Sequence, residues 1–404
     1  MSVSESLSSA PAVGTLRLAT AGSVDDGKST LVGRLLHDSK SVLSDQLESI
    51  SRTGTPDLAL LTDGLRAERE QGITIDVAYR YFATPRRRFI LADTPGHVQY
   101  TRNMVTGAST AELTIILVDA RNGVVDQTRR HASIAALLRV PRVVLAVNKM
   151  DLVGYEEAAF TRIAREFTSY ARELGLSSIT AIPISALAGD NVVDRSDRME
   201  WYDGPTVLSH LETVPVSPES PSAPARFPVQ YVIRHDETRH YAGQLVSGTL
   251  RVGSAVTVHP SGRTSTIAGL NVLGTEVDEA HAGTSLTVRL SDELDVSRGD
   301  LLAPSDDHPP LVTRDVHASA CHLSDRPLRA GQRVLLRHGT RTVRALVTSL
   351  GEPPELTANA LTPHLTLRTA DPLPLDPYPH IRRTGSFLLV DPSDGTTLTA
   401  GMVR

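Results

Sequence analysis

The chain has 404 residues but little cysteine, few aromatic residues and no long apolar run. Cys321 is its only cysteine, which excludes an intramolecular disulfide and a cysteine-based metal cluster. No apolar run approaches the ~18 residues that indicate a membrane-spanning helix. Residues 1–14 are rich in serine, alanine and proline and lack the basic start and apolar segment of a signal peptide. We therefore expect a cytoplasmic protein whose residues 1–14 form a disordered leader.

Lysine is also scarce. Of the 41 basic residues only Lys28, Lys40 and Lys149 are lysines, and the other 38 are arginines. Lys28 and Lys149 lie in candidate nucleotide motifs, where a compact ammonium on a flexible stem is hard to replace by a planar guanidinium; chance is the alternative explanation. The formal net charge of -5 argues against a dedicated nucleic-acid-binding protein, so no nucleic-acid partner is expected.

The first half of the chain shows an alternating pattern of strands and helices. From residue 15 to 212 this pattern predicts βαβ units on a mostly parallel sheet. A four-residue gap between two of the strands predicts one antiparallel hairpin at the sheet edge. The expected strands cover residues 16–21, 79–83, 88–92, 114–118, 143–147 and 179–183, and the expected helices cover 28–37, 98–108, 128–138 and 156–174.

A proline- and serine-rich segment, residues 213–226, predicts a domain linker. Beyond it, short strands separated by glycine turns predict two small β-barrels, at residues 227–306 and 307–404, and no helix. One of these expected strands covers residues 244–250. The predicted architecture is therefore an α/β P-loop domain followed by two β-barrel domains.

The most specific motif is Gly22-x-x-x-x-Gly27-Lys28-Ser29, which follows a predicted strand and opens a predicted helix. This pattern is typical of a phosphate-binding P-loop, because glycines let backbone N–H groups converge on phosphates at a helix N-terminus. Lys28 would contact the β- and γ-phosphates and Ser29 would ligate Mg²⁺. The alternative is a glycine-rich turn with an incidental lysine. The predicted phosphate-binding residues are Gly22, Ser23, Val24, Asp25, Asp26, Gly27, Lys28, Ser29 and Thr30.

Two further motifs distinguish a GTPase from an ATPase or a kinase. The stretch Asp93, Thr94, Pro95 and Gly96 follows an apolar strand, where the carboxylate would support Mg²⁺ and the Gly96 N–H would contact the γ-phosphate. The stretch Asn148, Lys149, Met150 and Asp151 follows another. There Asp151 would accept from guanine N1–H and its 2-amino group, which adenine lacks. The residues Ser185, Ala186 and Leu187 predict a third guanine contact, from a backbone N–H.

Two residues are candidates for the hydrolysis step. Thr74 is a candidate hydroxyl ligand that would join Mg²⁺ only when a γ-phosphate is bound; a polar loop threonine is the alternative. His97, directly after Gly96, is a candidate for orienting the attacking water; a surface histidine without a role is the alternative. The predicted catalytic residues are thus Lys28, Thr74 and His97.

The chain resembles the GTPase subunit of bacterial sulfate adenylyltransferase, a family related to elongation factor Tu. The resemblance is carried by the motifs above, by residues 67–82, 93–104 and 119–131, and by residues 226–234 and 384–403 in the predicted barrels. It implies GTP and Mg²⁺ as cofactors, and GTP hydrolysis that drives ATP and sulfate to adenylylsulfate and diphosphate. It also implies a partner, the small ATP-pyrophosphatase-like catalytic subunit, in a heterodimer or larger complex that binds ATP and sulfate.

Motifs for the adenylyl transfer itself are missing from this sequence. It contains no second P-loop, no Ser-Gly-Gly-x-Asp-Ser loop and no His-x-x-His pair. We therefore expect the transfer to take place on another polypeptide and this chain to supply energy from GTP. An elongation-factor-like carrier of an aminoacylated RNA and a regulatory GTPase switch are the alternatives.

Overall fold

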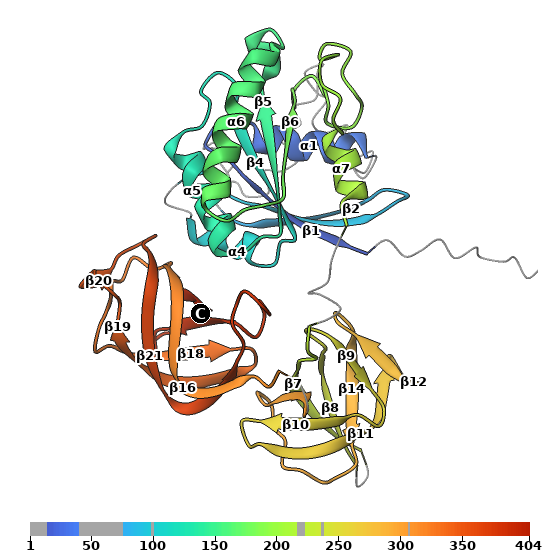
Figure 1. Ribbon diagram of the computed structural model, residues 1–404, viewed down its shortest axis with the longest axis vertical. Coiled ribbons are helices and arrows are strands. Elements are labelled where there is room, and N and C mark those ends of the chain that lie inside the picture. Colours follow the sequence, from blue (N-terminus) through green and yellow to red (C-terminus); the bar gives the residue numbers. More distant parts are fainter. Residues whose placement is uncertain (1–13, 40–75, 98–100, 216–222, 236–237, 306–307) are drawn as a thin grey trace, which may run out of the picture. The chain divides into compact units, whose positions relative to one another are not determined.

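The computed structural model describes residues 14–39, 76–97, 101–215, 223–235, 238–305 and 308–404. The chain forms two compact units, Met1–Val216 and Ser217–Arg404, which are described separately (Figure 1). The predicted domain boundaries at 212/213 and 226/227 remain predictions. Within the described residues, no helix is long and apolar enough to cross a membrane.

The first unit is built on a six-stranded sheet with the order β2-β3-β1-β4-β5-β6. All neighbours are parallel except β2 and β3, which form the predicted antiparallel hairpin. The central strand β4 is buried along its whole length, as its continuous apolar sequence predicts. The strands are β1 (Leu16–Ala21), β2 (Ala78–Ala83), β3 (Arg88–Asp93), β4 (Leu113–Asp119), β5 (Arg142–Asn148) and β6 (Ile179–Pro183).

The helices of this unit pack their apolar residues against the sheet. In α6, Ile163, Phe167 and Ala171 recur at four-residue spacing and are fully buried. Helices α5 and α6 lie side by side, α5 against β4 and α6 against β5 (Figure 1). The helices are α1 (Lys28–Asp38), α4 (Thr101–Ser109), α5 (Asp126–Leu137), α6 (Glu157–Glu173) and α7 (Val207–Thr213), with a 3₁₀ turn η3 (Met150–Val153).

Helix α7 was not predicted. Thr206 caps its N-terminus by accepting a hydrogen bond from the Ser209 N–H at 3.2 Å. Arg87, from the β2–β3 turn, is buried and donates to the carbonyls of Leu211 at 2.8 Å and Val214 at 2.6 Å. This arginine satisfies carbonyls at the helix C-terminus, so a contact distant in sequence stabilises a helix of only seven residues.

The second unit contains two β-barrels, which confirms the expected fold class. In the first barrel, β10, β15, β7, β8, β14 and β11 follow one another, and pairing of β10 with β11 closes the ring. Its strands are β7 (Phe227–His235), β8 (Thr238–Gln244), β9 (Thr249–Arg251), β10 (Ala255–His259), β11 (Arg263–Val272), β12 (Thr275–Val277), β13 (Glu279–His281), β14 (Ser285–Leu290) and β15 (Leu301–Pro304).

The second barrel closes through β16-β21-β19-β18-β22-β23 around its own apolar core. Among the described residues of this unit no helix occurs, as expected. The strands are β16 (Leu311–His322), β17 (Leu328–Arg329), β18 (Arg333–His338), β19 (Arg341–Ser349), β20 (Glu355–Leu356), β21 (Leu361–Leu375), β22 (Ser386–Val390) and β23 (Thr397–Val403).

The single strand expected at residues 244–250 is wrong. Strand β8 ends at Gln244, and β9 begins only at Thr249. Between them Gly248 has a φ of +68°, and a Cβ there would lie 2.5 Å from the Ala225 nitrogen. The apolar residues in this segment therefore belong to a tight turn against residue 225, a contact that periodicity does not reveal.

Candidate nucleotide-binding site

The predicted nucleotide motifs gather at one edge of the six-stranded sheet. Strands β1, β3, β4 and β5 are parallel, so their carboxyl ends share this edge. Asp93 ends β3, Asp119 ends β4, and Asn148 ends β5 directly opposite Asp119. In open α/β sheets, ligands bind outside this edge.

Lys28 lies at the centre of the phosphate loop that connects β1 to α1. Its Nζ is buried and donates to the carbonyls of Gly22 at 2.9 Å and Ser23 at 2.8 Å. Burial lowers the pKa of Lys28, against the charges of Asp26 and Asp93, which raise it. The loop thus holds a desolvated cation where the predicted phosphates would bind.

Gly27 must be a glycine for two reasons. Its φ of +90° lies in the left-handed region, and a Cβ would stand 2.4 Å from the Asn148 side-chain nitrogen. The loop is braced internally by Asp26, which accepts from the Ser23 N–H at 2.6 Å. Burial raises the pKa of Asp26, and the hydrogen bond from Ser23 and the charge of Lys28 oppose it. Among the other predicted phosphate residues, Val24 and Asp25 are exposed and Ser29 and Thr30 are half-buried.

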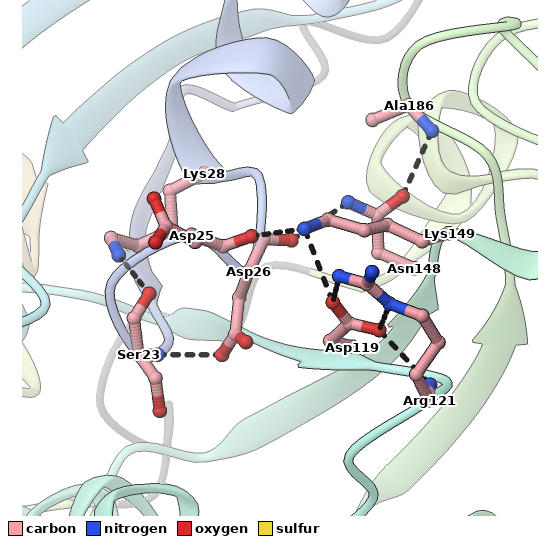
Figure 2. Close-up of polar contacts among 9 residues, drawn as sticks. All are labelled: Ser23, Asp25, Asp26, Lys28, Asp119, Arg121, Asn148, Lys149 and Ala186. Carbon is pink, nitrogen blue, oxygen red and sulfur yellow. Dashed lines mark hydrogen bonds and ion pairs between the residues drawn. The ribbon is translucent and has the colours of Figure 1, made fainter. Parts of the chain in front are cut away.

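Asn148 joins the phosphate loop to the third guanine motif (Figure 2). Its Nδ2 donates to the Asp26 carbonyl at 2.8 Å, and its Oδ1 accepts from the Ala186 N–H at 2.9 Å. Arg34 of α1, which was not predicted, donates to the carbonyls of Ala186 at 3.2 Å and Leu187 at 2.5 Å. These contacts bring residues 22–29, 148–151 and 185–187 together, as the sequence predicts.

Lys149 spans the two motifs as well. Its backbone is left-handed, with a φ of +62°, and its Nζ donates to the Asp25 carbonyl at 2.5 Å and pairs with Asp119 at 3.1 Å (Figure 2). Arg121 also pairs with Asp119, through Nε at 3.0 Å and Nη2 at 2.6 Å. Burial alone would raise the pKa of Asp119, but the hydrogen bonds from Arg121 and Lys149 outweigh it and lower this pKa to about 2.

Neither Asp119 nor Arg121 was predicted from the sequence. The available signal was the place of Asp119 at the end of a buried apolar strand, the same context that singled out Asp93. Its carboxylate stays ionised and holds the Lys149 ammonium beside the phosphate loop.

The predicted guanine-selecting carboxylate belongs to Asp151. It lies in η3 and is partly exposed, next to the fully buried Met150. Within the described residues the Asp151 carboxylate forms no hydrogen bond or ion pair. Ser185 is buried, whereas the Leu187 side chain is 74% exposed. The selecting role of Asp151 and the base contact at residues 185–187 remain predictions.

The turn that follows β3 lies directly on the phosphate loop. Asp93 is buried and accepts from the Thr20 hydroxyl at 2.9 Å, and the Thr94 hydroxyl donates to the Thr20 carbonyl. A Cβ on Gly96 would lie 2.4 Å from both the Gly22 carbonyl oxygen and the Lys28 Nζ. Only glycine fits at this distance, so the peptide around residue 96 packs closely on the phosphate loop, and its contact with a γ-phosphate remains a prediction.

Of the two residues predicted to act in hydrolysis, the structure describes His97 but not Thr74. His97 follows this turn and is exposed, and the chain after it, residues 98–100, lies outside the described residues. Thr74 also lies outside the described residues. Both roles remain predictions.

Helix α5 contributes two residues that the sequence analysis missed. The Gln127 Nε2 donates to the Gly96 carbonyl at 3.0 Å and lies 3.0 Å from the His131 Nε2. His131 is 1% exposed, and burial, with smaller contributions from the charges of Lys28 and Arg130, lowers its pKa to about 3. A neutral histidine and an amide therefore support the turn that precedes His97.

Known proteins match this chain along nearly its whole length. The family model for the elongation factor Tu GTP binding domain matches residues 14–232. The bifunctional enzyme CysN/CysC of Mycobacterium tuberculosis (strain H37Rv) is 51% identical over 96% of this chain and 67% of that protein. Sulfate adenylyltransferase subunit 1 of Aeromonas hydrophila is 48% identical, and that of Citrobacter koseri 47%, each over 96% of this chain and 86% of the relative.

Proposed function

Because this chain belongs to the sulfate adenylyltransferase subunit 1 family of elongation factor Tu-type GTPases, we propose a division of labour in which it binds and hydrolyses GTP while a second polypeptide transfers the adenylyl group. The chain is a GTPase subunit of sulfate activation. Neither the aminoacyl-RNA carrier nor the regulatory switch is favoured, since the relatives at 47–51% identity carry sulfate-activation names. The cytoplasmic location stays a prediction.

The observation that carries this proposal is the link through Asn148. One buried side chain bonds the phosphate loop at Asp26 and the residue 185–187 loop at Ala186. A nucleotide that spans these loops would meet Lys28 and the backbone amides of the loop at its phosphates. Its base would meet Asp151, whose carboxylate accepts from the N1–H and 2-amino groups of guanine. Adenine lacks these donors, so a bound adenine would cover the Asp151 carboxylate and leave it unpaired, which penalises its binding.

Magnesium fits the residues present. In nucleotide sites Mg²⁺ is bound by one or two protein oxygens together with phosphate oxygens and water. Ser29 supplies a hydroxyl in the first turn of α1, and Asp93 a carboxylate that the Thr20 hydroxyl holds at the end of the neighbouring strand. We assign Ser29 and Asp93 to the metal shell, with Thr74 as the predicted third ligand. When bound, the metal neutralises charge on the β- and γ-phosphates.

For hydrolysis we assign three roles. Lys28 stabilises charge on the transferred phosphoryl group, and the Gly96 N–H contacts the γ-phosphate. His97, directly after Gly96, positions the attacking water. The close packing of Gly96 on Lys28 supports this assignment, because it puts the turn before His97 at the phosphate end of the site.

The subunit name of the relatives implies a partner, which we propose to be a small ATP-pyrophosphatase-like subunit. On it, a sulfate oxygen would attack the α-phosphorus of ATP, forming the phosphoric–sulfuric anhydride of adenylylsulfate and releasing diphosphate. The anhydride is an uphill product, so GTP hydrolysis on this chain supplies the driving force.

The test is to co-purify the chain with that small subunit and measure GTP hydrolysis with and without ATP and sulfate. We expect sulfate and ATP together to stimulate hydrolysis, and labelled sulfate to appear in adenylylsulfate only when GTP is present. Omission of sulfate alone is the matched control. GTP hydrolysis that ignores sulfate and the partner would contradict the proposal and favour a regulatory switch.

A further inference from the structure

Gly96 combines two properties that conflict. The space against Gly22 and Lys28 admits only glycine there, yet glycine is the residue whose backbone rotates most freely. The Gly96–His97 peptide would therefore sample many orientations unless another group held it. Gln127 provides such a hold, because its Nε2 donates to the Gly96 carbonyl oxygen at 3.0 Å.

The hydrogen bond from Gln127 fixes more than the orientation of the Gly96 carbonyl. A peptide unit is planar, so a carbonyl held in one direction also fixes the N–H of the next residue and the position of its Cα. The next residue is His97, the candidate for orienting water. Gln127 therefore sets the starting point from which the His97 side chain leaves the backbone, across 31 residues of sequence.

The amide orientation of Gln127 follows from its neighbours. A carbonyl oxygen only accepts, so the Gln127 group that faces Gly96 must be the amide NH₂. The same nitrogen lies 3.0 Å from the His131 Nε2, so the second amide hydrogen points there and His131 must accept it through a neutral ring. Its other ring nitrogen, Nδ1, then carries the proton and is buried with no hydrogen-bond partner among the described residues.

An unpaired buried N–H costs free energy, so His131 lowers the local stability of the fold. Its neutral state agrees with its burial and with the positive charge of Lys28 nearby. An ordinary apolar residue would fill the same space without this cost. What the histidine provides and an apolar residue lacks is an acceptor that keeps the Gln127 amide in one orientation.

We propose that Gln127, oriented by His131, is a positioning residue for GTP hydrolysis that holds the Gly96–His97 peptide in the plane required by His97. Neither side chain touches the reacting atoms. This role rests on one part of the proposed function, that the chain hydrolyses GTP at this site, and it does not depend on the sulfate reaction.

The test compares variants of the full chain by single-turnover GTP hydrolysis and by GDP affinity. Gln127→Glu keeps the size of the side chain but loses both donors, and Gln127→Leu removes the polar group. Both should slow hydrolysis roughly 10- to 100-fold, the loss typical of a misplaced catalytic group. The GDP dissociation constant should stay within about threefold of the original, because Gln127 bonds neither the phosphate loop nor residues 148–151.

Two further variants separate positioning from a merely structural role. His131→Gln supplies an amide oxygen that can accept from Gln127 and should retain most activity, whereas His131→Leu should fall with the Gln127 variants. Ser133→Ala, on the same helix, removes contacts to the Arg129 carbonyl and Tyr170 and should hydrolyse GTP normally.

Unchanged hydrolysis in both Gln127 variants would overturn the inference. So would a parallel loss of hydrolysis, GDP affinity and melting temperature, because that pattern indicates general damage to the fold. If the unaltered chain hydrolysed no GTP, the proposed function would fail first, and the two failures are therefore distinguishable.

Discussion

His131 in the first unit and His338 in the second are both buried, but their surroundings differ. Each ring nitrogen of His338 lies beside a carbonyl oxygen, that of Ser386 at 3.0 Å and that of Pro374 at 3.1 Å. Among the described residues His131 has one polar contact, with Gln127, and its Nδ1 has none. The ring in the barrel thus has a polar neighbour at both nitrogens, whereas the ring at the nucleotide edge has one at a single nitrogen.

The charged residues repeat this contrast. In the second unit the buried Arg226 donates to Asp376 through Nε at 3.0 Å and Nη2 at 3.0 Å, and to the carbonyls of Ala225 and His308. At the nucleotide edge, Asp151 has no hydrogen bond within the described residues. Arg226 and Asp376 thus satisfy one another, whereas the Asp151 carboxylate keeps its acceptor capacity for a ligand.

The largest expected effect concerns Asp151. In Asp151→Asn the side-chain oxygen can still accept from N1–H, but the amide repels the 2-amino group and suits the 2-oxo group of xanthine. GTP affinity should fall on the order of 10⁴-fold and that for xanthosine triphosphate should rise, since sites built on such hydrogen bonds discriminate strongly. Titration with fluorescent analogues of both nucleotides measures this change in nucleotide preference.

Asn148→Ala provides the matched contrast for this variant. It removes the bonds to Asp26 and Ala186 but leaves the Asp151 carboxylate in place. It should weaken the binding of GTP and of xanthosine triphosphate alike, by about 1–3 kcal/mol for each buried group left unpaired. Unchanged GTP affinity in Asp151→Asn, or a switch of preference in Asn148→Ala, would refute the assignment of Asp151.

The next effect concerns the buried ion pair of Arg226 and Asp376 in the second unit. Arg226→Met leaves the Asp376 carboxylate buried with the Thr384 hydroxyl, at 2.6 Å, as its remaining side-chain donor. Breaking a buried pair in this way should destabilise the second unit by about 3–5 kcal/mol. Hydrogen-exchange mass spectrometry of the full chain, read on strands β7 and β16, measures this loss.

Arg368→Met serves as the control on the same barrel. Arg368 pairs with Asp315 at 2.6 Å, but both side chains are more than half exposed. Removing this pair should cost about 0–1 kcal/mol, because water screens it. The double variant Arg226→Met with Asp376→Leu should recover most of the lost stability. Equal protection from hydrogen exchange in Arg226→Met and Arg368→Met would show that Arg226 and Asp376 do not act as a buried ion pair.

The sequence predicted the strands of the first unit well for a physical reason. A parallel strand buried on both faces is a continuous apolar run, and the observed β4 and β5 contain the expected ranges and extend them by one residue at each end. It missed α7, whose stability depends on hydrogen bonds from Arg87, 124 and 127 residues distant in sequence. It also merged β8 and β9, because the turn between them is set by a contact with residue 225.

The site was predictable wherever its residues form local motifs. Gly27, Lys28 and Asn148 occupy positions that their spacing alone indicates. Asp119 with Arg121, Arg34 and Gln127 with His131 were missed, because they act on motif residues from other elements and no spacing rule connects them. Sequence thus indicates the groups proposed to contact the nucleotide more readily than the groups that hold those side chains in place.

The smallest expected effect is the pH dependence contributed by His131. Its pKa is about 3 in the folded chain, against an ordinary value of 6.5. Between these values the unfolded state binds one proton more, so the stabilising contribution is complete above pH 6.5 and is lost as the pH falls. The slope should be about 1.4 kcal/mol per pH unit.

His131→Gln should therefore flatten the pH dependence of unfolding between pH 6.5 and 5, where few carboxylates titrate. Trp201, the only tryptophan, lies in the first unit against Phe160, so its fluorescence during urea unfolding reports on this unit. His210 is half-buried and also has a pKa lowered by burial, but it is present in both proteins and cancels in the comparison. Identical slopes in the two proteins would show that His131 is not held neutral, and the Gln127 amide would then lose the acceptor that orients it.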